Sequence, residues 1–262
     1  MVQPAFVFDL ETCLMKKGIK RPDTIILSIA AIDLYTKRCF NMFLKPPKTT
    51  TTEELHEYLV DNHARVDSSL QVLSNINYDI NNAVEIREAL LLFKSFLLQK
   101  ENDMPYLLAH NGKSFDFKIL LGNLDKNDIK LSFRPIDTYR DMCQKIYRFK
   151  SYNLGSIYRN IVAKEKKVKI SWHNAYDDCL ALKAIVVEAS KRKATQEIVE
   201  YFNTLVPLLN KVYGVKLQKT YTLHKVEEEV LTNALTNAEI DHGIIMNTII
   251  DLTLQKCTPI KK

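Results

Sequence analysis

Two carboxylates lie inside an apolar segment near the start of the sequence. The stretch FVFDLET places Asp9 and Glu11 two residues apart in a run that its apolar character predicts to be a buried strand. Side chains at i and i+2 of a strand point to one face, so both should project together from its carboxyl-terminal end. Because adjacent carboxylates repel unless a cation lies between them, the pair indicates a Mg²⁺ or Mn²⁺ site. The alternative is an N-capping aspartate beside a surface glutamate.

A third carboxylate follows another predicted strand. In AHNGKSFDF, Asp116 comes after YLLAH and a polar turn, at the expected start of a helix. At helical spacing it shares a face with Ile119, Leu120 and Asn123, so we expect it to point inward. The alternative is an acid that only complements the positive end of the helix dipole.

A fourth carboxylate lies in WHNAYDDCLAL, where two aspartates are adjacent. Helical phase separates them: Asp177 falls on a mixed face, whereas Asp178 falls on the apolar face with Ala181, Leu182 and Ile185. We therefore predict that Asp178 points into the site. His173, five residues earlier, is placed to reach the same pocket, although a histidine at a helix start is often a cap or a solvated side chain.

The remaining pattern predicts a mixed α/β fold that positions these residues. The threonines and acids of KTTTTEE predict the start of a helix, and helical spacing predicts helices at residues 83–100, 114–124 and 174–193. Residues 60–84 are polar, and we expect them to be loop with short helices. Apolar runs predict strands at residues 5–11, 24–34, 38–46 and 104–110, with a short fifth strand inside FRPIDTYRDM. We expect a domain over residues 1–193 and a helical extension without a recognisable motif over residues 194–262.

Composition limits the classes of protein. The chain has 262 residues, 46% of them hydrophobic, and a formal net charge of +6, which fits a globular protein with a polyanionic partner. Five cysteines are widely spaced and lack zinc-ligand spacing, so we expect reduced thiols in an intracellular protein, cytoplasmic or nuclear. We expect neither a signal peptide nor a membrane span.

Taken together, four segments carry a family resemblance. FDLET, AHNGKSFDF, SYNLGSIYR and HNAYDDCLAL occur in that order and resemble the motifs of the DEDDh 3′–5′ exonucleases, in the DnaQ-like superfamily with an RNase H-like fold. The LGSIY segment and the H-x(4)-D spacing look most like the three-prime repair exonucleases (TREX). The resemblance covers about residues 5–190. It implies a five-stranded mixed sheet flanked by helices, followed by the C-terminal helical extension.

The resemblance also implies catalytic roles. Asp9, Glu11, Asp116 and Asp178 would bind two Mg²⁺ ions, for which Mn²⁺ would substitute, and His173 would be the general base. This assignment agrees with the chemistry of phosphodiester hydrolysis, which needs an activated water and a stabilised leaving oxygen.

Substrate contacts are implied by analogy with the family. Backbone amides near Thr12 and Cys13 would hold the terminal 3′-OH, and Leu14 or Met15 would wedge against the last base. The wedge stays open between those two because Cys13 and Leu14 replace the usual Thr-Gly. Asn111 and Phe115 would contact the penultimate nucleotides, with plain core as the alternative for Phe115. Ser114 stands where close relatives carry arginine, and the lysines of residues 164–169 are either phosphate contacts or a solvated face.

These features predict a metal-dependent exonuclease that releases nucleoside 5′-monophosphates from DNA 3′ ends, single-stranded or frayed duplex. The alternatives are a 3′–5′ exoribonuclease and a proofreading or inactive nucleic-acid-binding module attached to a partner. The resemblance further implies a homodimer formed through the third strand as the edge of the sheet.

Overall fold

The computed structural model describes residues 4–98, 100, 103–162 and 170–192. The chain divides into two compact units, the first reaching Ile185 and the second beginning at Val186. The basic segment 164–169 and the expected extension 194–262 lie outside the described residues, so the predictions for them, the domain boundary included, stay predictions.

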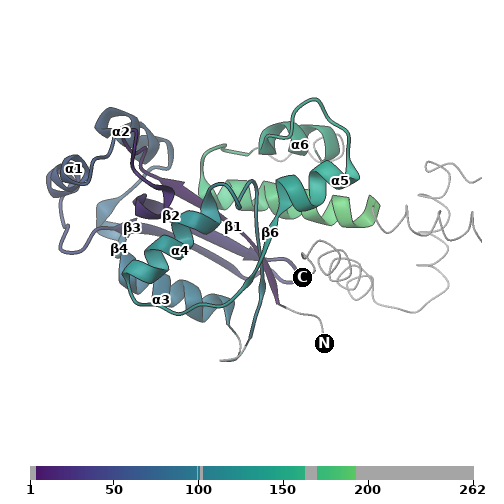
Figure 1. Cartoon of the computed structure of the whole chain (residues 1–262), viewed down its shortest axis with the longest axis horizontal. Coiled ribbons are helices and arrows are strands. Elements are labelled where there is room, and N and C mark those ends of the chain that lie inside the picture. The colour runs from purple at the N-terminus through teal and green to yellow at the C-terminus, as the bar shows by residue number, and fades with distance from the viewer. Residues whose placement is uncertain (1–3, 99, 101–102, 163–169, 193–262) are drawn as a thin grey trace, which may run out of the picture. The chain divides into compact units, whose positions relative to one another are not determined.

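A mixed six-stranded sheet forms the centre of the first unit (Figure 1). Its strand order is β4-β3-β2-β1-β5-β6, antiparallel between β1, β2 and β3 and parallel elsewhere. The strands are β1 Ala5–Thr12, β2 Ile26–Asp33, β3 Cys39–Lys45, β4 Val84–Glu85, β5 Tyr106–Ala109 and β6 Arg134–Asp137. The predicted mixed α/β sheet is confirmed, with one more strand than the five expected.

The additional strand changes the predicted edge. β4 lies outside β3 and pairs with it only at Leu44 and Lys45. The sequence predicted that the third strand is the edge of the sheet. That prediction is wrong, because β4 lies outside β3. A two-residue strand has no periodic signal, which explains why the sequence did not reveal it.

Helices cover the sheet and fill the connections. An α-helix over residues 175–192 matches the helix expected at 174–193. The others are α1 Thr52–Asp61, α2 Val66–Asn75, α3 Ile86–Leu97, α4 Asp116–Lys126, α5 Gln144–Ile146 and α6 Leu154–Ile161, with short 3₁₀ turns η1 Arg21–Asp23 and η2 Ile80–Asn82 and a π-helical turn η3 Thr138–Cys143. Among the helices of the described residues, none combines the length and the apolar character that a bilayer crossing requires.

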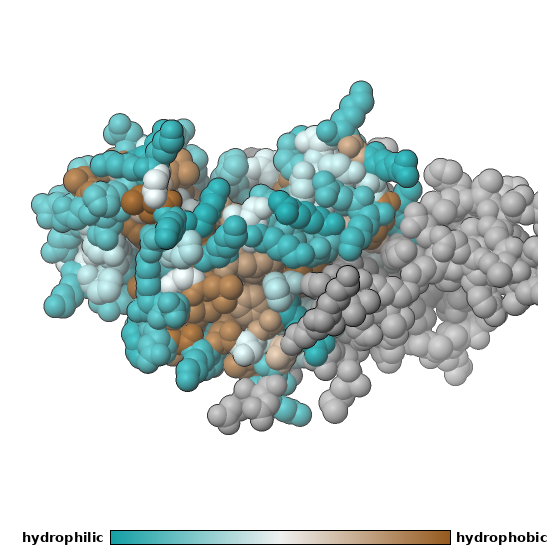
Figure 2. Space-filling view, viewed as in Figure 1, coloured by the Kyte–Doolittle hydropathy of each residue, from teal (hydrophilic) through white to brown (hydrophobic). Residues whose placement is uncertain are grey.

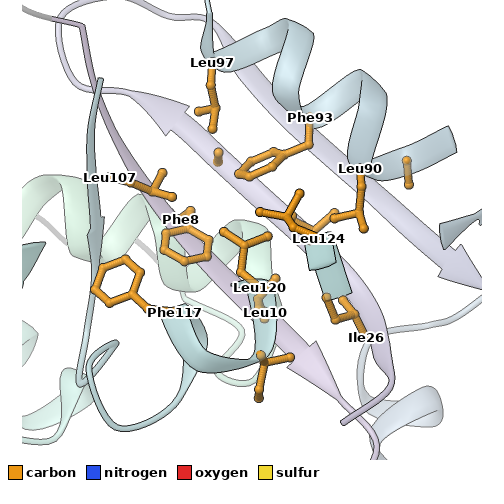
Figure 3. Packing of buried hydrophobic residues seen from close by; sticks show 14 of the residues in the cluster. Phe8, Leu10, Ile26, Leu90, Phe93, Leu97, Leu107, Phe117, Leu120 and Leu124 are labelled. Carbon is orange, nitrogen blue, oxygen red and sulfur yellow. The ribbon is translucent and has the colours of Figure 1, made fainter. Parts of the chain in front are cut away.

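The main hydrophobic core lies between the sheet and the layer of α3 and α4. Phe8 and Leu10 of β1 point from the sheet toward Phe93 of α3 and Leu120 of α4 (Figure 3). The predicted inward residues of α4, Ile119 and its neighbours, are buried in this layer. On the surface shown in Figure 2, which is mostly hydrophilic, apolar side chains gather where Figure 1 draws α3 and α4.

The core fixes which way the carboxylates of β1 point. Because Phe8 and Leu10 face α3 and α4, the alternate residues Asp9 and Glu11 face the other side of the sheet. The helix of residues 175–192 approaches there, since the Cys179 thiol donates a hydrogen bond to the Ala30 carbonyl of β2 (3.4 Å).

Helices α1 and α2 form a small layer that the sequence predicted only in part. The capping box at Thr51 and Glu54 starts α1 as expected. The stretch 60–84 was expected to be loop with short helices, and it contains the ten-residue helix α2, whose bounds the sequence did not predict. Its buried residues are Ser69 and Leu73, too sparse an apolar stripe to predict a helix of this length. Leu55, Leu59 and Leu73 pack with Cys13 and Leu27 in this layer.

Candidate active site

Asp9 and Glu11 lie at the carboxyl-terminal end of β1. Asp9 is opposite Ala30 and Glu11 opposite Ser28 on β2, and the register shifts immediately afterwards, between Glu11 and Thr12. Both side chains are half-buried, whereas Phe8 and Leu10 beside them are fully buried. The strand thus presents two acids on one face, as the i, i+2 spacing predicts.

Asp116 is the first residue of α4, and its side chain is buried (3% exposed). Its carboxylate accepts hydrogen bonds from its own backbone N–H and from that of Leu10. The second bond ties the start of α4 to β1 between Asp9 and Glu11. The inward orientation predicted for Asp116 is therefore the one that the structure has.

Asp178 lies one turn into the helix of residues 175–192 and is buried (9% exposed). Its Oδ2 accepts the backbone N–H of His173 (3.3 Å), while its Oδ1 is buried without a hydrogen-bond partner. The neighbouring Asp177 points elsewhere and accepts the Ser171 N–H (2.9 Å). Helical phase thus distinguished the two aspartates correctly.

The His173 ring stands against two of the acids. The backbone of His173 adopts φ 66°, a left-handed conformation that turns the chain just before the helix, and its side chain is exposed. One ligand atom from each of Glu11, His173 and Asp178 lies within 4.8 Å of the other two. The end of β1 and the segment that begins at His173 therefore meet, although they are far apart in the sequence.

The pKa values of Asp9 and Glu11 are raised in part by the charges of the other acids, as expected for four carboxylates in one site. Burial, followed by the negative charges of Asp116, Glu11 and Asp178, raises the pKa of Asp9 well above its usual value. Burial and the charges of Asp178 and Asp116 raise the pKa of Glu11 to about 7.

The other two acids are affected by burial in the same direction. Burial raises the pKa of Asp116 to about 7, although the two backbone N–H groups and the charge of Arg21 oppose the rise. Burial raises the pKa of Asp178 to about 6, against the hydrogen bond from His173. Four acids in one partly desolvated cluster are not stable together as anions without a cation.

These residues fit a divalent metal. The carboxylate oxygens are donors suited to a hard cation such as Mg²⁺ or Mn²⁺, and the His173 imidazole lies beside them. The buried Oδ1 of Asp178, which lacks a hydrogen-bond partner, is an oxygen that a cation would satisfy. Glu11, His173 and Asp178 thus form a candidate metal site.

The residues predicted to grip substrate lie around this cluster. Thr12 and Cys13 are buried, and the Cys13 N–H donates to the Ile25 carbonyl (3.0 Å). Leu14 is 44% exposed. Met15 forms an isolated bridge with Ala64 and packs against the α1–α2 layer. Of the two wedge candidates, Leu14 is the more exposed and Met15 is partly buried.

Asn111 and Phe115 lie on the turn between β5 and α4. Asn111 is exposed with φ 60°, and Phe115 is partly buried, with the Arg21 guanidinium 4.5 Å from its ring centroid. Arg140 Nη2 donates to Ser114 Oγ (3.1 Å), so η3 supplies a guanidinium beside the position where the sequence lacks an arginine.

Asp137 organises this turn and was not identified from the sequence. It is completely buried at the end of β6, and its carboxylate accepts the backbone N–H groups of Asn111, Lys113 and Tyr139 at 3.0–3.2 Å. An aspartate at the end of an apolar strand and before a helical turn is the only signal that the sequence carries.

Comparisons with known proteins agree with this architecture. The sequence model of the exonuclease family RNase_T matches residues 6–186, which include all four acids and His173. No curated protein matches the sequence. Because the family model covers more than half of the chain, this protein belongs to the exonuclease family. Members of that family generally use divalent metal ions.

Solved structures share the fold at low sequence identity. The zinc-bound complex of E. coli exonuclease I with single-stranded DNA is 13% identical with a TM-score of 0.51, and covers 78% of this chain and 43% of that one. Its complex with a dA16 oligonucleotide is 12% identical with a TM-score of 0.50, over 77% and 43%. Exonuclease X with 5′-overhanging duplex DNA is 15% identical with a TM-score of 0.45, over 72% and 93%. Because the match covers 43% of exonuclease I in both of its complexes, this chain spans less than half of the length of that protein.

Proposed function

We propose that the protein is a DEDDh-type 3′–5′ exodeoxyribonuclease that releases nucleoside 5′-monophosphates. The observation that carries the proposal is the meeting of Asp9, Glu11, Asp116 and Asp178, from three distant segments, beside the His173 ring. DNA is proposed as substrate because the exonuclease I structures that share the fold are described as complexes with single-stranded DNA.

In this proposal the four acids would hold two Mg²⁺ ions, for which Mn²⁺ would substitute. Such ions would supply acidification of a water and stabilisation of charge on the leaving 3′ oxygen. Asp9, Glu11 and Asp178 approach from the sheet and the helix, and Asp116 from the start of α4. An imidazole nitrogen of His173 takes the proton of the attacking water. The water oxygen then bonds to phosphorus as the bond from phosphorus to the 3′ oxygen breaks. The leaving 3′ oxygen takes a proton from solvent, so the products are a nucleoside 5′-monophosphate and a strand with a new 3′-hydroxyl.

The surroundings of the site support binding of a strand end. The exposed Leu14 side chain follows the two acids by three residues and is the proposed wedge against the last base. The backbone near Thr12 is proposed to hold the terminal 3′-OH. The Cys13 amide was expected to share this role, but it already donates to the Ile25 carbonyl (3.0 Å). Met15 stays the alternative wedge. Asn111 and Phe115 are proposed to contact the next nucleotides. An intracellular location, cytoplasmic or nuclear, stays part of the proposal. Homodimerisation is also proposed, without the expected interface through β3 as the outermost strand, because β4 lies outside it.

The test is a cleavage assay on the full chain. A 5′-labelled single-stranded DNA should shorten stepwise from its 3′ end in Mg²⁺ and not in chelator, and a 3′-blocked strand should resist. Matched RNA and duplex strands run in parallel identify the preferred substrate; faster cleavage of RNA would replace the DNA assignment with the exoribonuclease alternative.

Adjacent aspartates provide a matched pair of variants for this assay. Asp178→Asn should abolish cleavage, whereas Asp177→Asn should cleave at close to the wild-type rate because its side chain lies outside the acid cluster. Metal-independent cleavage, or equal activity of the two variants, would remove the basis of the proposal.

A further inference from the structure

A basic loop lies shortly after β1, the strand that carries Asp9 and Glu11. The loop consists of residues 16–21, KKGIKR, and all four of its cationic side chains are exposed. No acidic residue occurs between Glu11 and Asp23. Within the part of the chain that the structure describes, no ion pair involves these four cations, which are Lys16, Lys17, Lys20 and Arg21.

The first end of the basic loop is fixed to the α1–α2 layer. The Lys16 N–H donates to the His63 carbonyl (3.0 Å), and the Arg65 N–H donates to the Leu14 carbonyl (2.6 Å). These two bonds make a short antiparallel bridge at the tip where α1 turns into α2. The loop therefore leaves the active-site strand in a defined direction.

The second end is fixed to α4. Pro22 packs so tightly on Gly122 that a Cβ added there would lie 2.5 Å from it. The Asn123 side-chain amide donates to the Thr24 carbonyl (3.1 Å), and Lys126 Nζ pairs with Asp23 (2.8 Å). The course of the loop backbone is therefore fixed at both ends, which sets where its cationic side chains leave the chain.

Arg21 is the member of the loop beside the carboxylates. Its guanidinium stacks over Phe115, the residue immediately before Asp116. Stacking holds the guanidinium plane while its N–H edges stay available, and those edges match the geometry of phosphate oxygens. A polyanion approaching four carboxylates needs a fixed positive charge at the entrance of the site to offset the repulsion.

We propose that the basic loop is a phosphate-binding surface that holds the nucleic-acid backbone as its 3′ end enters the acid cluster, with Arg21 as the contact next to the site. This inference rests on the proposed exonuclease function. It assigns substrate binding to residues that do not bind metal or transfer protons. Their loss should therefore raise KM and weaken binding, with a smaller effect on kcat.

The test measures binding of a labelled single-stranded 20-mer to the full chain in an Asp178→Asn background, between 50 and 200 mM salt. Each lost phosphate contact lowers the slope of log affinity against log salt by about 0.7 for a single strand. Arg21→Ala should lower it by about 0.7, and the triple variant Lys16→Ala, Lys17→Ala, Lys20→Ala by about 2. Arg21→Lys should keep the slope.

Arg38→Ala is the matched control. Arg38 also stacks on a phenylalanine, Phe96 at 5.0 Å, but it lies at the β2–β3 hairpin, near the opposite end of β1. Its loss should leave affinity, slope and KM unchanged.

The outcomes separate the two proposals. If the wild type cleaves and binds DNA while Arg21→Ala and the triple lysine variant keep its affinity and salt slope, the basic loop is not a phosphate surface and the exonuclease proposal stands. If the wild type neither cleaves nor binds nucleic acid, both proposals are wrong.

Discussion

The acid cluster should make the metal-free protein less stable than a variant that lacks one of its charges. In Glu11→Gln the side chain keeps its shape and loses the negative charge that faces Asp178 and Asp116. At pH 8 in chelator, we expect this variant to unfold at a higher temperature than the wild type. With Mg²⁺ present the order should reverse, because the variant loses a metal ligand.

The magnitude follows from the raised pKa of Glu11, which moves from 4.5 to about 7. Its ionisation above pH 7 then costs the folded state roughly 3 kcal/mol. Because the side chain is half-buried, solvent screening reduces this, and we expect about 1–2 kcal/mol. For a unit of this size that corresponds to roughly 2–8 °C in Tm.

The sign of the pH dependence can be checked in the same experiment. A group whose folded pKa is raised stabilises the fold below its unfolded pKa and loses that contribution as pH rises through the folded value. The stability of the metal-free wild type should therefore fall between about pH 4.5 and 7 relative to Glu11→Gln. At pH 4 the two proteins should unfold at similar temperatures.

The assay is thermal denaturation of the full chain at pH 4, 6 and 8, with chelator and with Mg²⁺. Glu57→Gln, an exposed position on α1, is the control and should change nothing beyond a degree or so. If Glu11→Gln is less stable than the wild type at pH 8 in chelator, burial and the charges of Asp178 and Asp116 do not penalise the ionised Glu11, and the reasoning from its raised pKa is wrong.

Three further changes test the supports of the site. His173→Ala should lower kcat by about 10²–10⁴-fold in the oligonucleotide assay with little change in KM or Tm; a normal kcat would exclude a proton-transfer role. Asp137→Ala removes the acceptor of the partly buried N–H groups of Asn111, Lys113 and Tyr139, so denaturant unfolding should show a loss of about 1–3 kcal/mol. Gly122→Ala forces a methyl group against Pro22 and should cost about 1–3 kcal/mol and weaken DNA binding; unchanged binding would mean that η1 does not position Arg21.

The sequence predicted those parts of the fold whose signal is local. An apolar run located β1, helical spacing located the helix of residues 175–192, and helical phase separated Asp178 from Asp177. It did not reveal α2, whose buried stripe is thin, or β4, which exists only through pairing with β3. Such elements depend on tertiary contacts rather than on local pattern.

The residues of the candidate site were likewise predictable only where their signal is local. The four acids stand out because their residue type conflicts with an apolar setting. Asp137 does not, because its partners are backbone amides, as many as 26 residues away, that no residue pattern marks. The role of Arg21 depends on a stacking contact with Phe115 across 94 positions, so the sequence alone shows only a basic run.

The bridge between residues 14–16 and 63–65 has a consequence for engineering. The segment that follows the two acids takes its course from hydrogen bonds to a pair of helices far along the chain. Both bonds join backbone groups, so side chains at residues 12–16 can be exchanged without losing them, provided that residue 16 is not proline. An insertion or deletion within residues 12–16 would instead separate the Leu14 carbonyl and the Lys16 amide from residues 63–65, so a new terminal-nucleotide preference is best sought through substitutions that keep the length of the segment.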